Sequence, residues 1–246
     1  MSTGHLRVAD DDGVRTITID RPESKNALTT ATRAELCQLL ADADDDEAVR
    51  VVILAAVDPV FTAGVDFKDV SSPVVSTLNP GQALRAMRTP VICAVNGACV
   101  SGGLELALSC TFVIASERAR FADTHARLGV VPAWGLTALL PRAIGVRKAR
   151  ELSITGNFVD AAEALRIGLV NHVVPHEELA SFTRTLAAQI ADTDAVGDVL
   201  SLYRRGEDLS LADAIDLEAA HVPSRPFDPA AFAERGRAAA ARQREA

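Results

Sequence analysis

One short segment constrains the fold more than any other, a glycine-rich turn between a buried strand and an apolar helix. The run Val91 to Val95 is wholly apolar and predicts a buried strand, and Leu104 to Leu108 has the apolar residues of a helix. Gly102 and Gly103 therefore lie at a helix start, where the first N–H groups lack intrahelical acceptors and a ligand can approach the main chain. Glu105 follows within the first turn, so we expect a carboxylate beside a site that stabilises negative charge.

A second segment repeats this strand-to-turn pattern. Val51 to Leu54 predicts another buried strand, and a turn with a single glycine follows at Phe61 to Lys68. Ligands of open α/β proteins bind beyond the carboxyl ends of the strands, where both turns would lie. The N–H groups of Val65 and Gly102 could then point at one carbonyl oxygen and form a two-donor oxyanion hole. The alternative is that the glycines only make turns.

Other patterns predict the elements near the N-terminus. Residues 14–19 alternate like a strand, and the leucines between residues 28 and 40 have helical spacing, with Thr29 or Thr30 as a cap. The acidic run at 42–47 is typical of a solvated helix end. Residues 70–80, with Asn79-Pro80-Gly81, break the periodicity and predict a mobile loop.

The C-terminal third is predominantly helical by the same criteria. Asp160, Glu163 and Gly168 predict an N-cap, a capping-box acid and a C-terminal glycine for one short helix. The apolar residues from Leu179 to Ile190 predict an amphipathic helix that closes the domain or makes a subunit contact. The last residues, Ala238 to Ala246, predict a helix or a frayed end.

Composition excludes several function classes. The 246 residues are 48% hydrophobic and only 4% aromatic, which predicts one main domain with an aliphatic core. A net charge of −8 without clustered Lys and Arg argues against nucleic-acid binding. No run reaches membrane-spanning length and the N-terminus lacks a leader pattern, so we expect a cytoplasmic protein. The four cysteines have no metal-binding spacing and are expected to be reduced core residues, with no metal site: Cys37, Cys93, Cys99 and Cys110.

Several motifs together resemble the enoyl-CoA hydratase/isomerase (crotonase) family. In chain order they are Arg21-Pro22 with Asn26-Ala27-Leu28, Ala63-Gly64-Val65-Asp66, Asn96-Gly97 with Gly102-Gly103-Leu104-Glu105, Phe121-Ala122-Asp123 with Leu128-Gly129, and Thr155-Gly156 with Gly168-Leu169-Val170. No single motif is decisive, but their order is the one expected of the family. The resemblance spans residues 10–180.

The resemblance implies an α/β fold of the ClpP/crotonase type, with a spiral of ββα units in residues 1–180 and a helical oligomerisation or lid region in 181–246. It implies an acyl-CoA thioester substrate, no cofactor apart from the coenzyme A of the substrate, and a homotrimer or dimer of trimers. It also implies that the amides of Val65 and Gly102 form the oxyanion hole. Arg21, Lys25 and Lys68 lie where the family holds the nucleotide and phosphates. The substrate and CoA contacts fall to Ser24, Lys25, Ala27, Ala63, Asp66, Phe67, Lys68, Gly103 and Trp134.

Two positions carry the implied chemistry. In two-carboxylate hydratases of the family, one glutamate activates water for attack at C3 and the other shares the proton traffic at C2. Glu105 matches the first, whereas His125 stands in the place of the second. Imidazole can relay a proton near neutral pH but lacks the paired acceptors of a carboxylate. Asp123 and Arg127 either tune His125 or only solvate its loop.

Some alternatives stay open. Asp66 is expected to cap a helix after Gly64 and so hold the Val65 amide, and Trp134 either narrows the acyl pocket or belongs to the core. The first function hypothesis is an enoyl-CoA hydratase of fatty-acid metabolism, or a related lyase or isomerase. The second is a non-catalytic acyl-CoA binding protein. The third is a hydrolase with Ser101 as nucleophile and His125 as base, because this turn also resembles that of the Clp peptidases.

Overall fold

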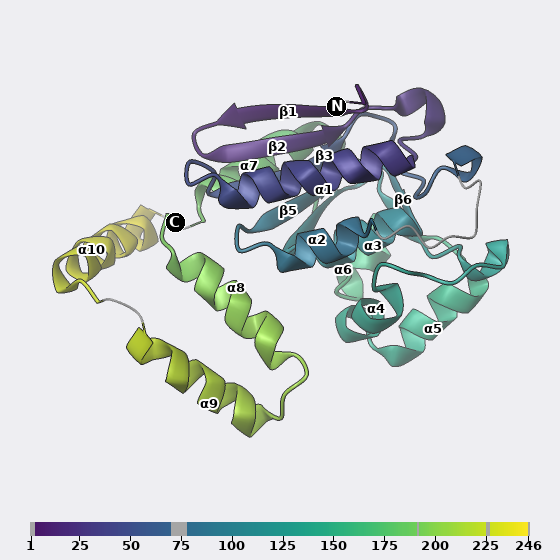
Figure 1. Ribbon diagram of the computed structural model, residues 1–246. Coiled ribbons are helices and arrows are strands. Elements are labelled where there is room, and N and C mark those ends of the chain that lie inside the picture. Colours follow the sequence, from purple (N-terminus) through teal and green to yellow (C-terminus); the bar gives the residue numbers. More distant parts are fainter. Residues whose placement is uncertain (1–2, 70–77, 191, 225–226, 246) are drawn as a thin grey trace. The chain divides into compact units, whose positions relative to one another are not determined.

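The computed structural model describes residues 3–69, 78–190, 192–224 and 227–245 (Figure 1). The chain divides into two compact units, Met1–Gly197 and Asp198–Ala246. The first unit therefore extends beyond residue 180 and includes the amphipathic helix that the sequence predicts from Leu179.

Two sheets form the frame of the first unit. The larger has the order β1-β2-β3-β5-β7-β10 and is parallel apart from the β1–β2 pair, and the smaller has the order β4-β6-β8-β9 and is parallel apart from β8–β9. The strands of the larger sheet are β1 Leu6–Asp11, β2 Val14–Ile19, β3 Val51–Ala56, β5 Val91–Val95, β7 Phe112–Ser116 and β10 His172–Val174. Those of the smaller are β4 Val60–Thr62, β6 Ala98–Val100, β8 Arg120–Ala122 and β9 Val159–Asp160.

From β3 to β8, consecutive strands alternate between the two sheets, and each pair leads into a helical segment. The pairs β3–β4, β5–β6 and β7–β8 each contribute one strand to each sheet, which is the spiral of ββα units that the sequence predicts. The α-helices of the first unit are α1 Thr30–Asp45, α2 Pro80–Ala86, α3 Gly102–Ser109, α4 Leu136–Ile144, α5 Val146–Thr155, α6 Ala161–Arg166 and α7 Leu179–Ala188. Single 3-10 turns lie at η1 Pro22–Ser24, η2 Phe67–Asp69, η3 Ala126–Leu128 and η4 His176–Glu178.

The central strands β3 and β5 of the larger sheet are apolar at every position and pack against side chains on both faces. Along β3, Val52 and Leu54 pack into the cluster that includes α1, α2 and α3, whereas Val51 and Ile53 pack into the cluster that includes α7. This alternation follows from the two-residue period of a strand. Figure 1 shows α1 and α2 crossing one face of this sheet and α7 on the other. The apolar side of α7 thus closes the first unit.

Several local predictions are confirmed. β2 and β5 have the predicted bounds, and the Thr29 hydroxyl accepts from the Thr32 N–H at the start of α1, at 3.0 Å. Asp160 caps α6 by accepting from the Glu163 N–H at 2.8 Å. The capping-box role of Glu163 is wrong, because its carboxylate binds Arg166 on the same helix.

The loop prediction for residues 70–80 is partly wrong. Residues 70–77 lie outside the described residues, but α2 begins at Pro80. The Asn79 side chain accepts from the Gln82 N–H at 2.8 Å, and a proline suits the first helical position because its missing N–H would lack a partner there. Asn79-Pro80-Gly81 is therefore a helix start rather than a turn.

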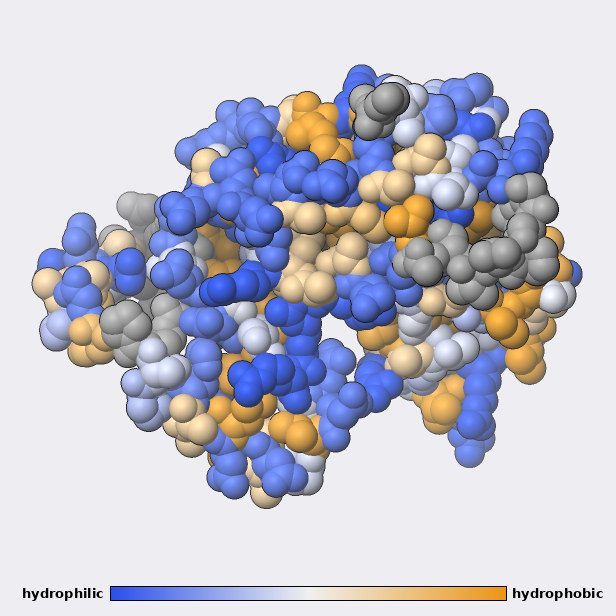
Figure 2. Space-filling model, viewed as in Figure 1, coloured by the Kyte–Doolittle hydropathy of each residue, from blue (hydrophilic) through white to orange (hydrophobic). Residues whose placement is uncertain are grey.

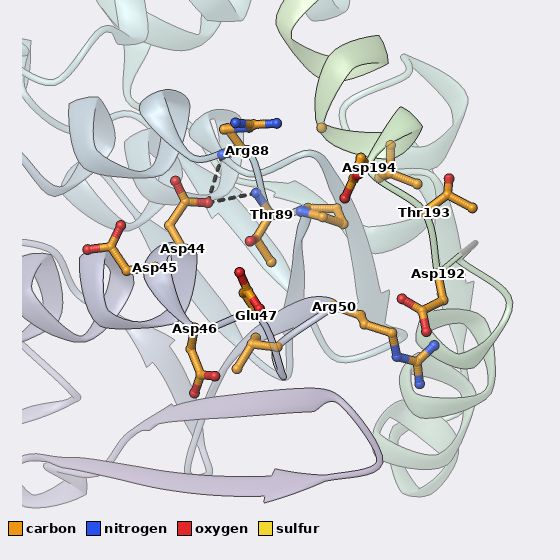
Figure 3. A pocket seen from close by; sticks show the side chains of 14 residues that line it. Asp44, Asp45, Asp46, Glu47, Arg50, Arg88, Thr89, Asp192, Thr193 and Asp194 are labelled. Atoms are coloured by element: carbon orange, nitrogen blue, oxygen red, sulfur yellow. Dashed lines mark hydrogen bonds between the residues drawn. The ribbon is translucent and has the colours of Figure 1, made fainter. Parts of the chain in front are cut away.

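The acidic run at residues 42–47 marks the end of α1, as expected. Figure 3 shows its carboxylates along a pocket that Arg50, Arg88 and Asp192 also line. Asp44 accepts from the backbone N–H groups of Arg88 and Thr89, at 2.8 and 2.7 Å, so this run also holds the chain just before β5.

The second unit is helical and carries apolar side chains on its surface. It contains most of α8 Ala195–Gly206, with α9 Leu211–His221, η5 Val222–Ser224 and α10 Pro229–Glu245. Figure 2 shows hydrophobic surface on α8 and α9. Its exposed large apolar side chains include Val199, Tyr203, Leu209, Leu211, Ile215, Val222, Phe227 and Phe232. Among the described helices, none has both the length and the apolar character needed to cross a bilayer.

Candidate active site

The two glycine turns predicted from the sequence lie against each other. A Cβ added to Gly64 would lie 3.0 Å from the Val100 carbonyl oxygen and 3.1 Å from the Gly102 nitrogen. Gly64 also has a φ of +90°, which side chains rarely adopt. Only glycine therefore allows the main chains of the two turns to approach this closely.

The N–H groups of Val65 and Gly102 are available to donate hydrogen bonds to a ligand in this arrangement. Gly102 is the first residue of α3, so its N–H has no intrahelical acceptor. Around Val65, the Leu28 N–H donates to the Gly64 oxygen at 2.8 Å and the Asp66 N–H donates to the Leu28 oxygen at 3.0 Å. The Val65 N–H itself donates to no group in the described part of the chain.

The segment before α1 runs beside the first turn. The Ala63 N–H donates to the Lys25 carbonyl at 3.1 Å, and Leu28 forms a parallel bridge with Val65. The residues expected to contact substrate or CoA in these two segments are thus neighbours in space. Ser24 and Ala63 are half-buried, Ala27 and Asp66 are buried, and Lys25, Phe67 and Lys68 are exposed.

Asp66 and Arg21 stabilise the first turn together. Asp66 accepts from the Lys68 N–H at 2.9 Å, so it caps the single turn η2 rather than a longer helix. The Arg21 guanidinium donates to the Asp66 carboxylate and to the Ala27 carbonyl. The hydrogen bond from Arg21, followed by that from Lys68, holds the pKa of Asp66 below its usual value. The place of Arg21 near the phosphates of CoA stays a prediction, and its guanidinium is paired with Asp66 within the protein.

Glu105 is a carboxylate buried in the apolar first turn of α3. Its side chain is 3% exposed. One oxygen, Oε1, accepts from the Trp134 N–H at 2.6 Å and from the Leu136 N–H at 3.3 Å. Burial raises the pKa of Glu105, and these hydrogen bonds only partly oppose it. A carboxyl group with a raised pKa is suited to taking up and releasing a proton.

His125 lies between Glu105 and a second carboxylate. Its Nε2 is 3.6 Å from Glu105 Oε2, and its Nδ1 is 2.6 Å from Asp123 Oδ1. The ring is 13% exposed and Asp123 is 1% exposed. Burial alone would raise the pKa of Asp123, but hydrogen bonds from His125 and Ser153 outweigh it and lower that pKa. Asp123 is a site residue whose role the sequence left open.

Trp134 is both buried and part of the wall of the site. The ring carbon Cζ3 lies 3.0 Å from the position that a Gly102 Cβ would occupy. The guanidinium carbon of Arg33, a buried residue that sequence analysis missed, lies 5.9 Å from the centre of the indole ring. Gly103 packs closely on the other side of the turn, since its Cβ would lie 2.7 Å from the Thr62 methyl group.

The Ser101 hydroxyl contacts Thr124 and not His125. Its hydroxyl lies 2.7 Å from the Thr124 hydroxyl and accepts from the Thr124 N–H at 3.0 Å. The hydrolase hypothesis needs a Ser101–His125 hydrogen bond, and among the described residues there is none. Both ring nitrogens of His125 face carboxylates instead.

Comparison with known proteins agrees with this geometry. Residues 9–232 match the family model described as enoyl-CoA hydratase/isomerase. The chain belongs to the enoyl-CoA hydratase/isomerase family. Since that match covers both glycine turns as well as Glu105 and His125, the order of motifs read from the sequence correctly indicated the family.

Individual members of the family resemble the chain over most of its length. It is 40% identical to the "Probable enoyl-CoA hydratase 1, peroxisomal" of Arabidopsis thaliana over 84% of this chain and 80% of that protein. It is 33% identical to the "Short-chain-enoyl-CoA hydratase" of Clostridium acetobutylicum over 89% and 88%. The crystal structure of an enoyl-CoA hydratase from Mycobacterium tuberculosis superposes with a TM-score of 0.78 at 44% identity, covering 89% of this chain and 98% of that chain. The chain thus has the crotonase fold.

Proposed function

We propose that this protein hydrates the 2,3 double bond of an enoyl-CoA thioester in acyl-CoA metabolism. The observation that carries the proposal is the buried Glu105 carboxylate beside the Gly102 turn, with the His125 imidazole 3.6 Å away. The names of the relatives support the same reaction. Coenzyme A enters as part of the substrate.

In the proposed mechanism, the amides of Val65 and Gly102 bind the thioester oxygen. Attack at C3 pushes the electrons of the double bond onto this oxygen and creates an enolate. Two N–H donors aimed at that atom stabilise the developing charge more than the neutral carbonyl, which is how an oxyanion hole accelerates a reaction. Gly64 keeps the two turns close enough for both donors to act.

The proton steps fall to Glu105 and His125. Ionised Glu105 takes a proton from water as the water oxygen bonds to C3, and protonated His125 delivers a proton to C2 as the enolate collapses. The product has then gained the elements of water, with the hydroxyl from the attacking water and the C2 proton from His125. A proton shift from Glu105 to Nε2 of His125 returns the pair to its starting state, over the 3.6 Å between the two side chains.

The remaining predicted site residues bind the substrate in this proposal. Lys25 and Lys68 are exposed cations beside the first turn and are suited to the phosphates of CoA. Ala27 and Ala63 leave room for the pantetheine arm. Trp134, next to Gly102, limits the space for the acyl chain.

A turnover screen tests the proposed function. We expect wild-type protein to hydrate at least one of a set of short, medium and aromatic enoyl-CoA esters, and Glu105→Ala to lower kcat by about 100-fold or more. Equal turnover by both proteins would rule out the role of Glu105. Binding without turnover, measured by calorimetry on wild-type protein, would instead identify an acyl-CoA binding protein. Thioester hydrolysis that is lost in Ser101→Ala and kept in Glu105→Ala would favour the hydrolase.

We also propose that the chain forms a homotrimer or a dimer of trimers. The exposed apolar side chains of the second unit support this, because apolar patches on a soluble surface commonly mark protein contacts. Sedimentation of the full chain tests it, with a monomer across micromolar concentrations as the contradicting result.

A further inference from the structure

We propose that Asp123 positions His125, so that the acid–base group of this protein is an Asp123–His125–Glu105 relay. The proposal rests on the proton-transfer role of His125 given above. Asp123 acts on His125 and makes no contact with the reacting atoms, so it is a positioning residue.

The hydrogen bonds determine which ring nitrogen carries the proton. Asp123 Oδ1 accepts from the backbone N–H of His125 at 3.1 Å and lies 2.6 Å from Nδ1 of the same residue. An ionised carboxylate can only accept, so Nδ1 must be the donor in this contact. In the neutral ring, Nε2 is then left without a proton, and it is Nε2 that faces Glu105.

Asp123 is itself held rigidly. It follows β8 directly, is 1% exposed, and is hydrogen-bonded by Ser153 of α5 as well as by His125. These bonds keep it ionised at neutral pH. A fixed negative charge on the Nδ1 side stabilises the imidazolium form that delivers a proton to C2.

The charged groups around His125 come from three elements of the fold. Glu105 faces His125 from α3 and Asp123 faces it from the end of β8. Arg127 of η3 is directed away, because its guanidinium donates to the Thr155 carbonyl and to Asn157. Two carboxylates on opposite sides of one imidazole favour a proton on the ring and oppose a second negative charge nearby.

The fold supplies a matched control. His176 also lies against an aspartate, with Nε2 3.1 Å from Asp58 Oδ2, and its Nδ1 is 3.0 Å from the Ser116 hydroxyl. This pair is also an aspartate and a histidine, but among the described residues no buried glutamate forms an ion pair with its ring.

The experiment compares Asp123→Asn with Asp58→Asn in the full chain. We expect Asp123→Asn to lower kcat for crotonyl-CoA about 10- to 100-fold, with KM changed by less than about 2-fold, as for loss of a group that orients a catalytic residue. The pH dependence of kcat should change as well, because the imidazole loses its neighbouring anion. Asp58→Asn should change neither quantity.

Nitrogen NMR of labelled wild-type protein gives a readout that does not depend on turnover or on the folding of a variant. We expect the neutral His125 ring to carry its proton on Nδ1. A proton on Nε2, or a kcat and pH profile unchanged in folded Asp123→Asn, would overturn the proposal. If wild-type protein hydrates no enoyl-CoA, the proposed function fails while the NMR result still decides the position of the proton.

Discussion

Two aspartate–histidine pairs in this protein have similar local geometry and different surroundings. In the first, Asp123 binds Nδ1 of His125 and the other ring nitrogen faces Glu105, which is 3% exposed. In the second, Asp58 binds Nε2 of His176 and the other nitrogen faces the Ser116 hydroxyl. Asp58 is 60% exposed, whereas Asp123 is 1% exposed.

In the proposed mechanism, the third partner is what gives the first histidine pair its chemical role. Glu105 is buried and its pKa is raised, and in the proposed mechanism it exchanges a proton with the ring across from it. Ser116 is also buried, but its hydroxyl accepts from the Arg118 N–H and so stabilises the turn that follows β7. His176 of η4 therefore connects the end of β7, through Ser116, with Asp58 in the segment between β3 and β4.

The largest expected difference between the pairs is in catalysis. We expect His125→Gln to lower kcat for enoyl-CoA hydration by about 10²- to 10⁴-fold, because a general acid–base group is lost. His176→Gln should retain wild-type kcat. Steady-state rates of both variants with crotonyl-CoA decide this, and an equal loss in both would show that the two pairs do not differ in function.

A smaller difference is expected in stability at Glu105. Because burial raises the folded-state pKa of Glu105, ionising it costs free energy in the native state, and this cost appears as the pH rises through that pKa. We therefore expect Glu105→Gln to be more stable than wild type at neutral pH by about 1 kcal/mol, or about 2–4 °C in Tm. Thermal melts across pH should show the gain shrinking in acid; a gain that is independent of pH would contradict the buried-charge explanation.

The smallest effect, opposite in sign, is expected at Asp58. Burial would raise its pKa, but hydrogen bonds from Asn96 and His176 outweigh this and lower it. A carboxyl group whose pKa is lowered in the folded state stabilises the protein above its unfolded-state pKa of about 3.9. This stabilisation is lost as the pH falls. Because Asp58 is 60% exposed, Asp58→Asn should cost less than about 1 kcal/mol at neutral pH. Urea unfolding at neutral and acid pH measures it, and a larger loss in acid would refute this assignment.

Local patterns were sufficient to predict much of the frame. Uninterrupted apolar runs predicted β3 and β5, and the caps Thr29 and Asp160 follow from their own side-chain chemistry a few residues away. The pattern at Asn79-Pro80 does not distinguish a turn from a helix start, because proline favours both turns and the first position of a helix. Only the acceptance of the Gln82 N–H by Asn79 distinguishes the two.

The individual residues of the site were predictable from the sequence, but the contacts between them were not. Glu105 and the glycines of the two turns were recognisable because helix starts and close main-chain approaches require particular residues. The partners of Arg21 and His125 were not, because Arg21 meets Asp66 across 45 positions of the chain and Glu105 meets His125 across 20.

By itself, the amino-acid order determined the family, the strand-to-turn-to-helix segments and the buried carboxylate, because each depends on groups close together in the chain. The tertiary structure decided that His125 lies between Asp123 and Glu105. It also decided that the Ser101 hydroxyl contacts Thr124 and that Trp134 lies against Gly102. Hydrogen bonds and burial act over a few ångströms in space, and separation along the chain does not reveal which groups come within that range.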